Sequence, residues 1–483
     1  MLKKFKKYFM AQFYCQLAIR RSAFAPFDAV SLLTNARARL LSRAAFISIF
    51  AAIFSLSLLS CSKKLSPEEI QAKKQEEIQK AKDQALSNYI EALSDEEKIC
   101  QLFLVNVGGR ESYVPSEKSG ILYGKEEEGE ALLPGGVILF TYNISRDPLE
   151  AHDFIKSIRD FYLKEGKTPP YISVDQEGGL VNRFRGLTSP FWSQKEVSEK
   201  FSLEGARLLY SAQARQLKCL GFHMNIAPVV EVENDSNREF LVSRTFGSLQ
   251  NVKDYGKIAI QAFEDLGIAT VLKHFPGNSS TDPHTGLPEI KVTSEKLESE
   301  YFAPFRELLP CSSALLMSHA RISLEDDSSY TEAKTPACLS RYWVSDVVKN
   351  KLGFSSLILS DDIFMGALSE NGFPPQEAAV KAIKAGIDII MLTEKRFGEV
   401  AGSLLAKTKE DPDFASEVKR AVTNILRYKI KAGILILEET KAEGQSEKES
   451  SPSFTIKVND SYPDFDLKAF NDAYNDGMKA FDN

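Results

Sequence analysis

The sequence predicts an α/β protein whose main domain is a TIM-type (β/α)8 barrel. Two observations lead to this prediction. Short apolar or β-branched runs alternate with helix-like stretches along the chain, a pattern typical of a buried parallel sheet covered by helices. Eight such runs over about 340 residues fit a closed barrel better than an open sheet. A doubly wound sheet is the structural alternative.

The eight candidate strands lie in a domain that begins at Ser94. Ser94 and Glu97 have the spacing of a capping box ahead of an apolar run, which indicates the start of a helix. We assign residues 94–437 to this single domain and expect no second large domain after it. In chain order, the candidate strands are Gln101 to Val107, Gly136 to Phe140, Tyr171 to Val174, Asn225 to Val232, Thr270 to His274, Leu315 to Ser318, Ser356 to Ser360 and Asp388 to Leu392.

Residues 1–60 have the outline of an export signal. Nine lysines and arginines precede an apolar segment, Ala44 to Ser60, which is shorter than the roughly 20 residues that a membrane-spanning helix needs. The segment runs into Leu58-Leu59-Ser60-Cys61 and resembles a bacterial lipoprotein signal, with Cys61 as the lipidated first residue of the mature chain. We therefore expect a lipid anchor in the cell membrane or outer membrane, on the extracytoplasmic side. An uncleaved anchor helix is the alternative.

Two polar segments flank the main domain. Residues 61–93 are rich in Lys, Glu, Gln and Ala and are typical of a charged helical tether. Residues 438–483 are expected to form a polar linker and a C-terminal amphipathic helix. The apolar stripe of that helix is expected to dock on the barrel, with partner binding as the alternative; it comprises Leu467, Phe470, Tyr474, Met478 and Phe481.

Charge and cysteine usage exclude several classes of function. The chain has a net charge of −6, which becomes −14 once the nine basic and one acidic residues of the first 60 are removed. Nucleic acid is therefore not expected as a partner. Cys100, Cys219, Cys311 and Cys338 are widely spaced and form no CxxC pair, so neither a zinc site nor a redox motif is indicated. We expect buried single thiols, and the oligomeric state stays open.

Polar side chains gather where the candidate strands end. They are Asp175 with Gln176 and Glu177, Lys273 with His274, His319, and Asp361 with Asp362. In a barrel these ends converge on the catalytic face. Three of the five histidines, His274, His284 and His319, lie at or just after such ends, which favours a functional site over random scatter.

Two of these groups have the chemistry of a general acid/base and a nucleophile. Asp282 lies two residues before His284 on a loop, where a carboxylate can orient an imidazole and stabilise it when charged. Asp361 follows Ser360 at the end of the apolar run Leu357 to Leu359. The carboxylate is therefore expected to be held rigidly, as a nucleophile must be. A helix N-cap is the alternative role for Asp361.

Five ordered motifs together resemble glycoside hydrolase family 3, in its single-domain N-acetyl-β-glucosaminidase branch. The resemblance covers about residues 94–436. The motifs are Asp175-Gln176-Glu177-Gly178-Gly179 followed by Arg183, Arg244-Thr245-Phe246-Gly247, Lys273-His274-Phe275-Pro276-Gly277, Asp282-Pro283-His284-Thr285-Gly286-Leu287-Pro288 and Ser360-Asp361-Asp362.

The resemblance implies a retaining exo-β-N-acetylglucosaminidase that needs neither a metal nor an organic cofactor. It implies that Asp361 is the nucleophile and that His284, oriented by Asp282, is the acid/base, a histidine in place of the usual second carboxylate. It also implies that a carbohydrate substrate is bound by Asp175, Arg183, Arg244, Lys273 and His274. For Arg183 and Arg244, ordinary ion pairing is the alternative role. Peptidoglycan fragments as the substrate rest on this analogy alone.

The chain departs from the family pattern around the acid/base loop. Gly277-Asn278-Ser279 replaces the usual Gly-His-Gly, Pro283 replaces a serine, and Leu180 stands where an arginine is common. A catalytically degenerate lipoprotein that binds cell-wall sugar is therefore an alternative. A metal hydrolase using the histidines and Asp361 is another, although no HxH or HExxH spacing supports it. Phosphorolysis instead of hydrolysis stays open.

Overall fold

The computed structural model describes residues 66–113, 133–392, 396–440 and 452–480. The expected export signal, Cys61 and Phe481 lie outside these ranges. The chain divides into one unit up to Gln75 and a second from Glu76 onward. In the first unit, residues 66–75 are exposed and belong almost wholly to helix α3 (Pro67–Ala92). The second unit contains all of the barrel strands.

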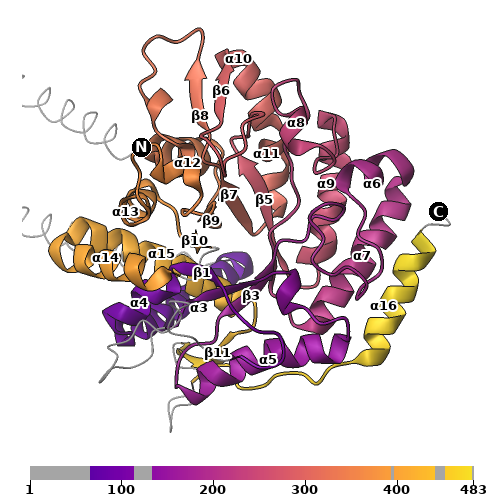
Figure 1. The fold of residues 1–483 in the computed structure, drawn as a ribbon. Helices are drawn as coiled ribbons and strands as arrows, with labels where there is room; N and C mark the ends of the chain where they lie inside the picture. The colour runs from indigo at the N-terminus through magenta and orange to yellow at the C-terminus, as the bar shows by residue number, and fades with distance from the viewer. Residues whose placement is uncertain (1–65, 114–132, 393–395, 441–451, 481–483) are drawn as a thin grey trace, which may run out of the picture. The chain divides into compact units, whose positions relative to one another are not determined.

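Eight parallel strands form the expected barrel (Figure 1). Their order is β10-β1-β2-β3-β4-β5-β7-β9, and a parallel bridge between Leu359 and Ile389 joins the two ends of the sheet. Each candidate run of the sequence overlaps one strand, so the predicted fold is confirmed. The strands are β1 (Phe103–Asn106), β2 (Gly136–Leu139), β3 (Tyr171–Val174), β4 (Met224–Asn225), β5 (Ala269–Phe275), β7 (Ala314–Met317), β9 (Leu357–Ser360) and β10 (Ile390–Leu392).

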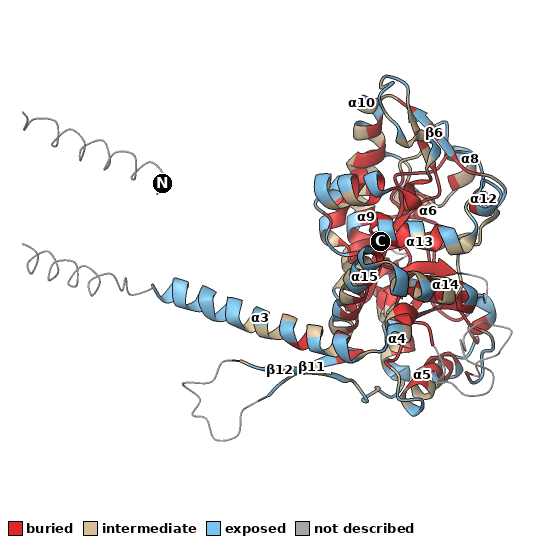
Figure 2. Cartoon of the chain, turned by 90° about the vertical axis from the view of Figure 1, so that its left-hand side faces the viewer, coloured by how far each residue is buried: buried red, intermediate tan, exposed pale blue. Residues whose placement is uncertain are grey.

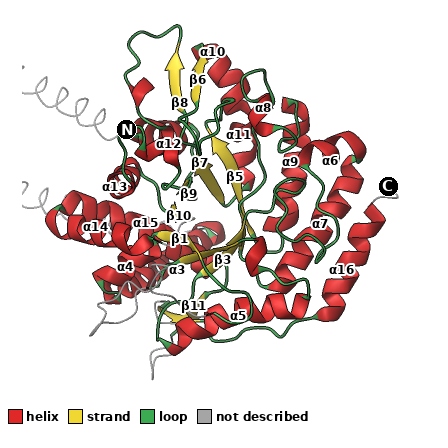
Figure 3. Cartoon of the chain, viewed as in Figure 1, coloured by secondary structure: helices red, strands yellow, loops and turns green. Residues whose placement is uncertain are grey.

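Helices surround the barrel on its outer side (Figure 3). Ser94 begins α4 with the predicted capping box, in which its hydroxyl accepts from the amide of Glu97 and the Glu97 carboxylate accepts from the amide of Ser94. The helices are α4 (Asp95–Gln101), α5 (Pro148–Lys164), α6 (Gln194–Lys200), α7 (Leu203–Leu220), α8 (Arg238–Leu241), α9 (Leu249–Glu264), α10 (Ser294–Lys296), α11 (Ala303–Leu308), α12 (Gly366–Ser369), α13 (Pro375–Ala385), α14 (Phe397–Glu410), α15 (Pro412–Lys431) and α16 (Leu467–Lys479). Two π-helical stretches, η3 (Leu297–Phe302) and η7 (Tyr342–Lys351), add to them.

The barrel strands are buried on both faces, as Figure 2 shows by its colouring. Phe275 illustrates the packing between strand and helix, because its ring lies 5.4 Å from that of Phe302, 5.0 Å from Phe305 and 6.5 Å from Trp343, measured between centroids. All four side chains are almost completely buried, and each such ring removes a large apolar area from water. This rigid packing fixes the strand that carries Lys273 and His274.

A short parallel pair of strands, β6 (Glu289–Val292) and β8 (Arg321–Leu324), lies outside the barrel sheet. β6 follows the loop that leaves β5, and β8 follows the loop that leaves β7. The segment with Asp282 and His284 therefore runs between the end of β5 and this pair, on the side of the barrel where the strands end.

The C-terminal segment returns to the barrel. β11 (Leu435–Glu439) pairs with β12 (Phe454–Val458) in antiparallel register, and α16 packs against α7. Of the predicted apolar stripe, Phe470 is buried, whereas Leu467 and Met478 remain 53% and 43% exposed. The contact face consists instead of Phe470 with small residues such as Gly477, where an added Cβ would stand 2.4 Å from the Ser189 hydroxyl. Small residues allow the close approach of α16 to its neighbours.

No helix within the described ranges combines the length and the apolar character needed to cross a bilayer.

Candidate active site

The predicted site residues converge where the barrel strands end. Asp175 and Asp361 directly follow β3 and β9, while Lys273 and His274 lie in the last part of β5. Arg183 and Arg244 come from the loops that leave β3 and β4. The closed sheet brings these segments together although they are far apart in sequence.

A network of charges links three of these segments, the loops after β3 and β4 and the end of β5. The Lys273 ammonium lies 2.6 Å from Asp175 Oδ1 and 2.6 Å from Glu177 Oε1. Arg244 binds the same Glu177 carboxylate with two parallel hydrogen bonds of 2.8 Å, from Nε and Nη2. Such bidentate contact fixes the guanidinium plane. Arg244 and Lys273 are thereby held in one orientation before any ligand binds.

Glu177 is the buried centre of this network. Burial raises the pKa of its carboxyl, but the charges of Lys273 and Arg244 outweigh that effect and hold the pKa well below its ordinary value. The carboxylate is therefore ionised at neutral pH. Its side chain is 1% exposed, so its role is to position the two cations; the sequence showed it only as a member of the Asp175-Gln176-Glu177 motif.

Arg183 is held on the other side of Asp175. Its Nη2 lies 3.3 Å from Asp175 Oδ2, and its guanidinium stacks at 5.1 Å over the ring of Phe140. Arg183 and Arg244 thus both form ion pairs, which the alternative interpretation of these residues expected. Their remaining N–H groups still provide donors for a ligand.

His274 is oriented by Glu231, a residue that the sequence analysis missed. Its Nδ1 lies 2.7 Å from Glu231 Oε1, and Asn278 donates to the same oxygen at 3.0 Å. Glu231 was hidden within the candidate strand Asn225 to Val232. The structure corrects that range, because β4 consists only of Met224–Asn225. After the cis Ala227–Pro228 peptide, only Val229 makes a bridge to β5.

Asp361 is a buried carboxylate without a cationic partner among the described residues. It is 8% exposed, and its Oδ1 accepts a hydrogen bond of 2.9 Å from the amide of Asp362. Its own amide donates to the Met317 carbonyl at 3.1 Å, which ties the segment to β7. Asp361 is not a helix N-cap, because the next helix, α12, begins at Gly366.

His319 lies behind this segment and is completely buried. Its Nε2 is 2.9 Å from the carbonyl oxygen of Asp362, and its Nδ1 is 3.2 Å from Cys338 Sγ. A carbonyl only accepts, so Nε2 carries the proton and Nδ1 accepts from the thiol. Burial lowers the pKa of His319 more strongly than the charge of Asp361 raises it. The ring is therefore a neutral support and does not belong to the reacting groups.

His284 and Asp282 form the predicted pair on an exposed loop. His284 Nδ1 lies 2.8 Å from Asp282 Oδ1, and the His284 amide donates to the same oxygen at 2.9 Å. These bonds, from the amide first and then from the ring, lower the pKa of Asp282. The His284 side chain is 68% exposed. This loop is tied to the segment after Asp361, since the amide of Ala367 donates to the Pro283 carbonyl at 3.3 Å.

Within the described ranges, no three His, Cys, Asp or Glu side chains come together as ligands of one metal ion. The donor set at this site suits hydroxyl and amide groups, because Asp175 and Glu177 are already paired with Lys273 and the two arginines.

The chain is similar in sequence to known proteins. The model of the "Glycosyl hydrolase family 3 N terminal domain" matches residues 95–428. A beta-hexosaminidase of Tolumonas auensis is 32% identical over 275 residues, covering 55% of this chain and 78% of that protein. Beta-hexosaminidase A of Pseudoalteromonas piscicida is 27% identical over 274 residues, covering 53% of this chain but only 45% of that longer relative.

Solved structures agree with the fold. A glycoside hydrolase family 3 beta-N-acetylglucosaminidase from Paenibacillus superposes with a TM-score of 0.62 at 24% identity, covering 74% of this chain and 66% of that one. The protein LpqI of M tuberculosis superposes with a TM-score of 0.61 at 25% identity, covering 71% and 96%.

Proposed function

Because the chain belongs to glycosyl hydrolase family 3, we propose that it is a retaining exo-β-N-acetylglucosaminidase that removes terminal GlcNAc from β-linked glycans. The observation that carries the proposal is Asp361, a buried carboxylate at the end of a barrel strand that no cation in the described part of the chain neutralises. The names of the similar beta-hexosaminidases support the class of sugar. The oriented His284–Asp282 pair supplies the proton transfer that the reaction needs.

The first step is attack by an Asp361 oxygen on the anomeric carbon of the sugar. A bond forms between that oxygen and the carbon while the glycosidic C–O bond breaks, which leaves a glycosyl ester on the enzyme. His284 in its charged form gives the Nε2 proton to the departing oxygen. Nδ1 is occupied by Asp282, so Nε2 is the nitrogen left to exchange the proton, and the Asp282 carboxylate stabilises the imidazolium.

The second step releases the sugar with its original configuration. Neutral His284 takes a proton from water, and the resulting hydroxide-like oxygen attacks the anomeric carbon and displaces Asp361. Two displacements on one carbon retain the configuration. Phosphate in place of water would give a sugar phosphate by the same route, and product analysis distinguishes the two.

The charged network is the proposed binding site of the sugar. Lys273 has one N–H beyond those directed at Asp175 and Glu177, and Arg244 keeps donors beyond its two bonds to Glu177. Asp175 adds a hydrogen-bond acceptor to the proposed sugar site, and His274 adds an imidazole ring. Since these groups are already fixed by Glu177 and Glu231, little side-chain ordering is left to occur when the sugar binds.

The natural substrate and location are extensions of this proposal. Peptidoglycan fragments are the proposed source of GlcNAc, and Cys61 is the proposed point of lipid attachment on the extracytoplasmic side. Both rest on the sequence pattern and the family resemblance. Incorporation of labelled fatty acid, lost in Cys61→Ala, tests the anchor.

Release of chromophore from an aryl N-acetyl-β-glucosaminide tests the reaction itself. Turnover by the purified protein is expected, with almost none in Asp361→Ala and much less in His284→Ala. Asp346→Ala is a matched control, because Asp346 is an exposed carboxylate on η7. No turnover in the unmodified protein, together with measurable GlcNAc binding, would instead support a sugar-binding protein without catalysis.

A further inference from the structure

A cavity lies at the opposite end of the barrel from the candidate active site. It has a volume of about 220 Å³. Its floor includes Ile172 in β3 and His223 just before β4, at the ends where strands begin, and Gly433 and Ile434 after α15. The catalytic groups follow the other ends of the strands, so the two sites are separated by the barrel core.

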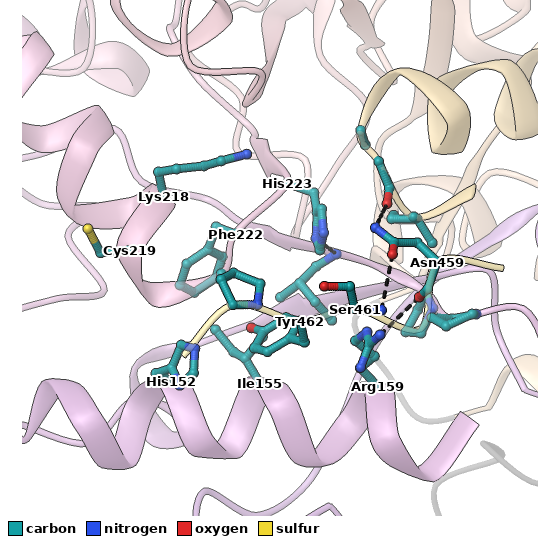
Figure 4. A pocket seen from close by; sticks show the side chains of 18 residues that line it. His152, Ile155, Arg159, Lys218, Cys219, Phe222, His223, Asn459, Ser461 and Tyr462 are labelled. Carbon is teal, nitrogen blue, oxygen red and sulfur yellow. Dashed lines mark hydrogen bonds between the residues drawn. The ribbon is translucent and has the colours of Figure 1, made fainter. Parts of the chain in front are cut away.

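The C-terminal segment forms one wall of this cavity (Figure 4). Asn459 accepts through its carbonyl from Arg159 Nη2 at 2.9 Å, and the ring of Tyr462 stacks 5.2 Å from the Arg159 guanidinium. Tyr462 also approaches Gly221 so closely that a Cβ there would stand 2.2 Å from its hydroxyl. Gly221 ends α7 at φ +95, a conformation that favours glycine. The wall is therefore built by specific contacts.

The charged groups that line the cavity are basic. Arg159 and Lys218 contribute positive charge, and none of the residues that line the cavity is an Asp or a Glu. The Lys218 ammonium has no hydrogen bond or ion pair with any residue in the described part of the chain. Arg159 is partly compensated by Asp160, whose carboxylate is 3.4 Å away and 44% exposed. Asp153, whose carboxylate lies 3.4 Å from His152 Nδ1, is a further acidic group beside the lining. The uncompensated positive charge is therefore that of Lys218.

His223 adds a neutral donor. Its Nδ1 accepts from the amide of Ile172 at 3.1 Å, so the proton must be on Nε2. Nε2 has no partner within the described residues. Burial, with the charges of Lys218, Lys429 and Arg159, lowers the pKa of His223 to about 3, so the ring stays neutral and offers an N–H.

Much of the remaining lining is apolar. Ile155, Ile172, Phe222 and Pro463 contribute aliphatic and aromatic surface beside the basic groups. The volume is below the roughly 300–1,000 Å³ of pockets for drug-sized ligands, which restricts the ligand to a small molecule. An apolar body with one anionic head would match both the lining and the charge.

We propose that this cavity binds a small organic anion, with a carboxylate or phosphate head at Lys218, Arg159 and His223 and an apolar body against Phe222 and Ile155. The site is separate from the proposed hydrolase reaction. Because Asn459 and Tyr462 form a wall, occupancy also holds the C-terminal segment on the barrel and stabilises its docking by mass action.

Calorimetric titration of the full chain tests the proposal with benzoate and phenyl phosphate as probes. Benzyl alcohol is the uncharged control. We expect at least one anion to bind at a single saturable site, benzyl alcohol to show no saturation, and Lys218→Met to weaken anion binding at least tenfold. Lys257→Met, an exposed lysine on α9, should leave it unchanged. Excess GlcNAc should also have no effect, since it is directed at the other end of the barrel.

Three results would overturn the proposal. They are failure of both anions to saturate, equal affinity in Lys218→Met and the unmodified protein, and displacement of the anion by GlcNAc. Lys218 is exposed near the end of α7, and its ammonium forms no hydrogen bond or ion pair within the described part of the chain. Methionine keeps the apolar length of the side chain. A thermal melt of Lys218→Met without ligand checks that it folds. Slower proteolysis within residues 459–466 when the anion is bound gives an independent readout.

Discussion

The buried ring of His319 donates a hydrogen bond of 2.9 Å from Nε2 to the carbonyl oxygen of Asp362, the residue after the proposed nucleophile. The bond joins the loop after β7 to the loop after β9. It fixes the main chain that carries Asp361 without contacting the reacting carboxylate. A nucleophile reacts only from a narrow range of positions. A small displacement of the main chain that carries it can therefore lower the rate of the reaction strongly.

Replacing His319 should therefore reduce kcat more than it changes KM. His319→Ala leaves the buried Asp362 carbonyl without its donor, which costs about 1–3 kcal/mol of stability. His319→Gln keeps a donor and should recover part of both losses. Steady-state kinetics and urea denaturation of the two variants measure this; equal kcat in both variants and the unmodified protein would show that the bond has no positioning role.

Asp361→Ala should lower kcat by about 10⁴-fold or more, the scale seen when an enzyme loses its nucleophile. The free energy of unfolding should change little, because no cation among the residues that the structure describes loses a partner when this carboxylate is removed. External azide, which attacks the anomeric carbon in place of the missing carboxylate, should restore part of the turnover as a glycosyl azide. Asp346→Ala treated in the same way should behave as the unmodified protein.

His284→Ala should show an effect that depends on the leaving group. General acid catalysis contributes about 10²–10⁴-fold, and an aryl group that leaves readily as an anion needs little of it. The variant should therefore lose far more activity on an alkyl glycoside than on a nitrophenyl glycoside. Asp282→Asn should show the same trend in weaker form. An identical loss on both substrates would contradict the role of His284 as the acid.

Glu231→Ala should raise KM by about tenfold, because His274 and Asn278 lose the acceptor that fixes them. A hydrogen bond to a charged group is worth roughly 1.5–3 kcal/mol. Glu231→Gln keeps an oxygen at the same place, so its KM should lie between those of Glu231→Ala and the unmodified protein. The measurement is the KM of the aryl glycoside. A fall in kcat with KM unchanged would show that Glu231 acts on the chemical step instead.

Lys429 should make folding stability rise with pH above neutrality. It is fully buried, donates to Gln101 Oε1 at 2.7 Å and to the Pro169 carbonyl at 2.9 Å, and burial lowers its pKa from 10.5 to about 7. Between those two values the unfolded chain binds the proton that the folded chain has lost, so the free energy of unfolding increases with pH. In Lys429→Met this slope should disappear. Urea denaturation at pH 7 and pH 10 measures it.

The strands and the residues at their ends were predictable because both depend on local patterns. A buried parallel strand is a short apolar run between helical stretches, so β3, β5 and β9 were located from sequence alone. Asp175, Lys273, His274 and Asp361 followed from the rule that such ends converge in a barrel. The Asp282–His284 pair was also predicted, because its two members lie two residues apart.

Tertiary structure alone decided which of these groups contact one another. Lys273 and Asp175 are 98 residues apart and His274 and Glu231 are 43 apart, so their partners depend on the order in which the strands close. For the same reason the sequence pattern concealed Glu231 and gave no sign of the basic cavity, whose wall comes from residues 459–463 after the barrel is complete. Local sequence determines which side chains reach the ends of strands, because burial and periodicity act over a few residues; pairing and cavities arise only when distant segments pack.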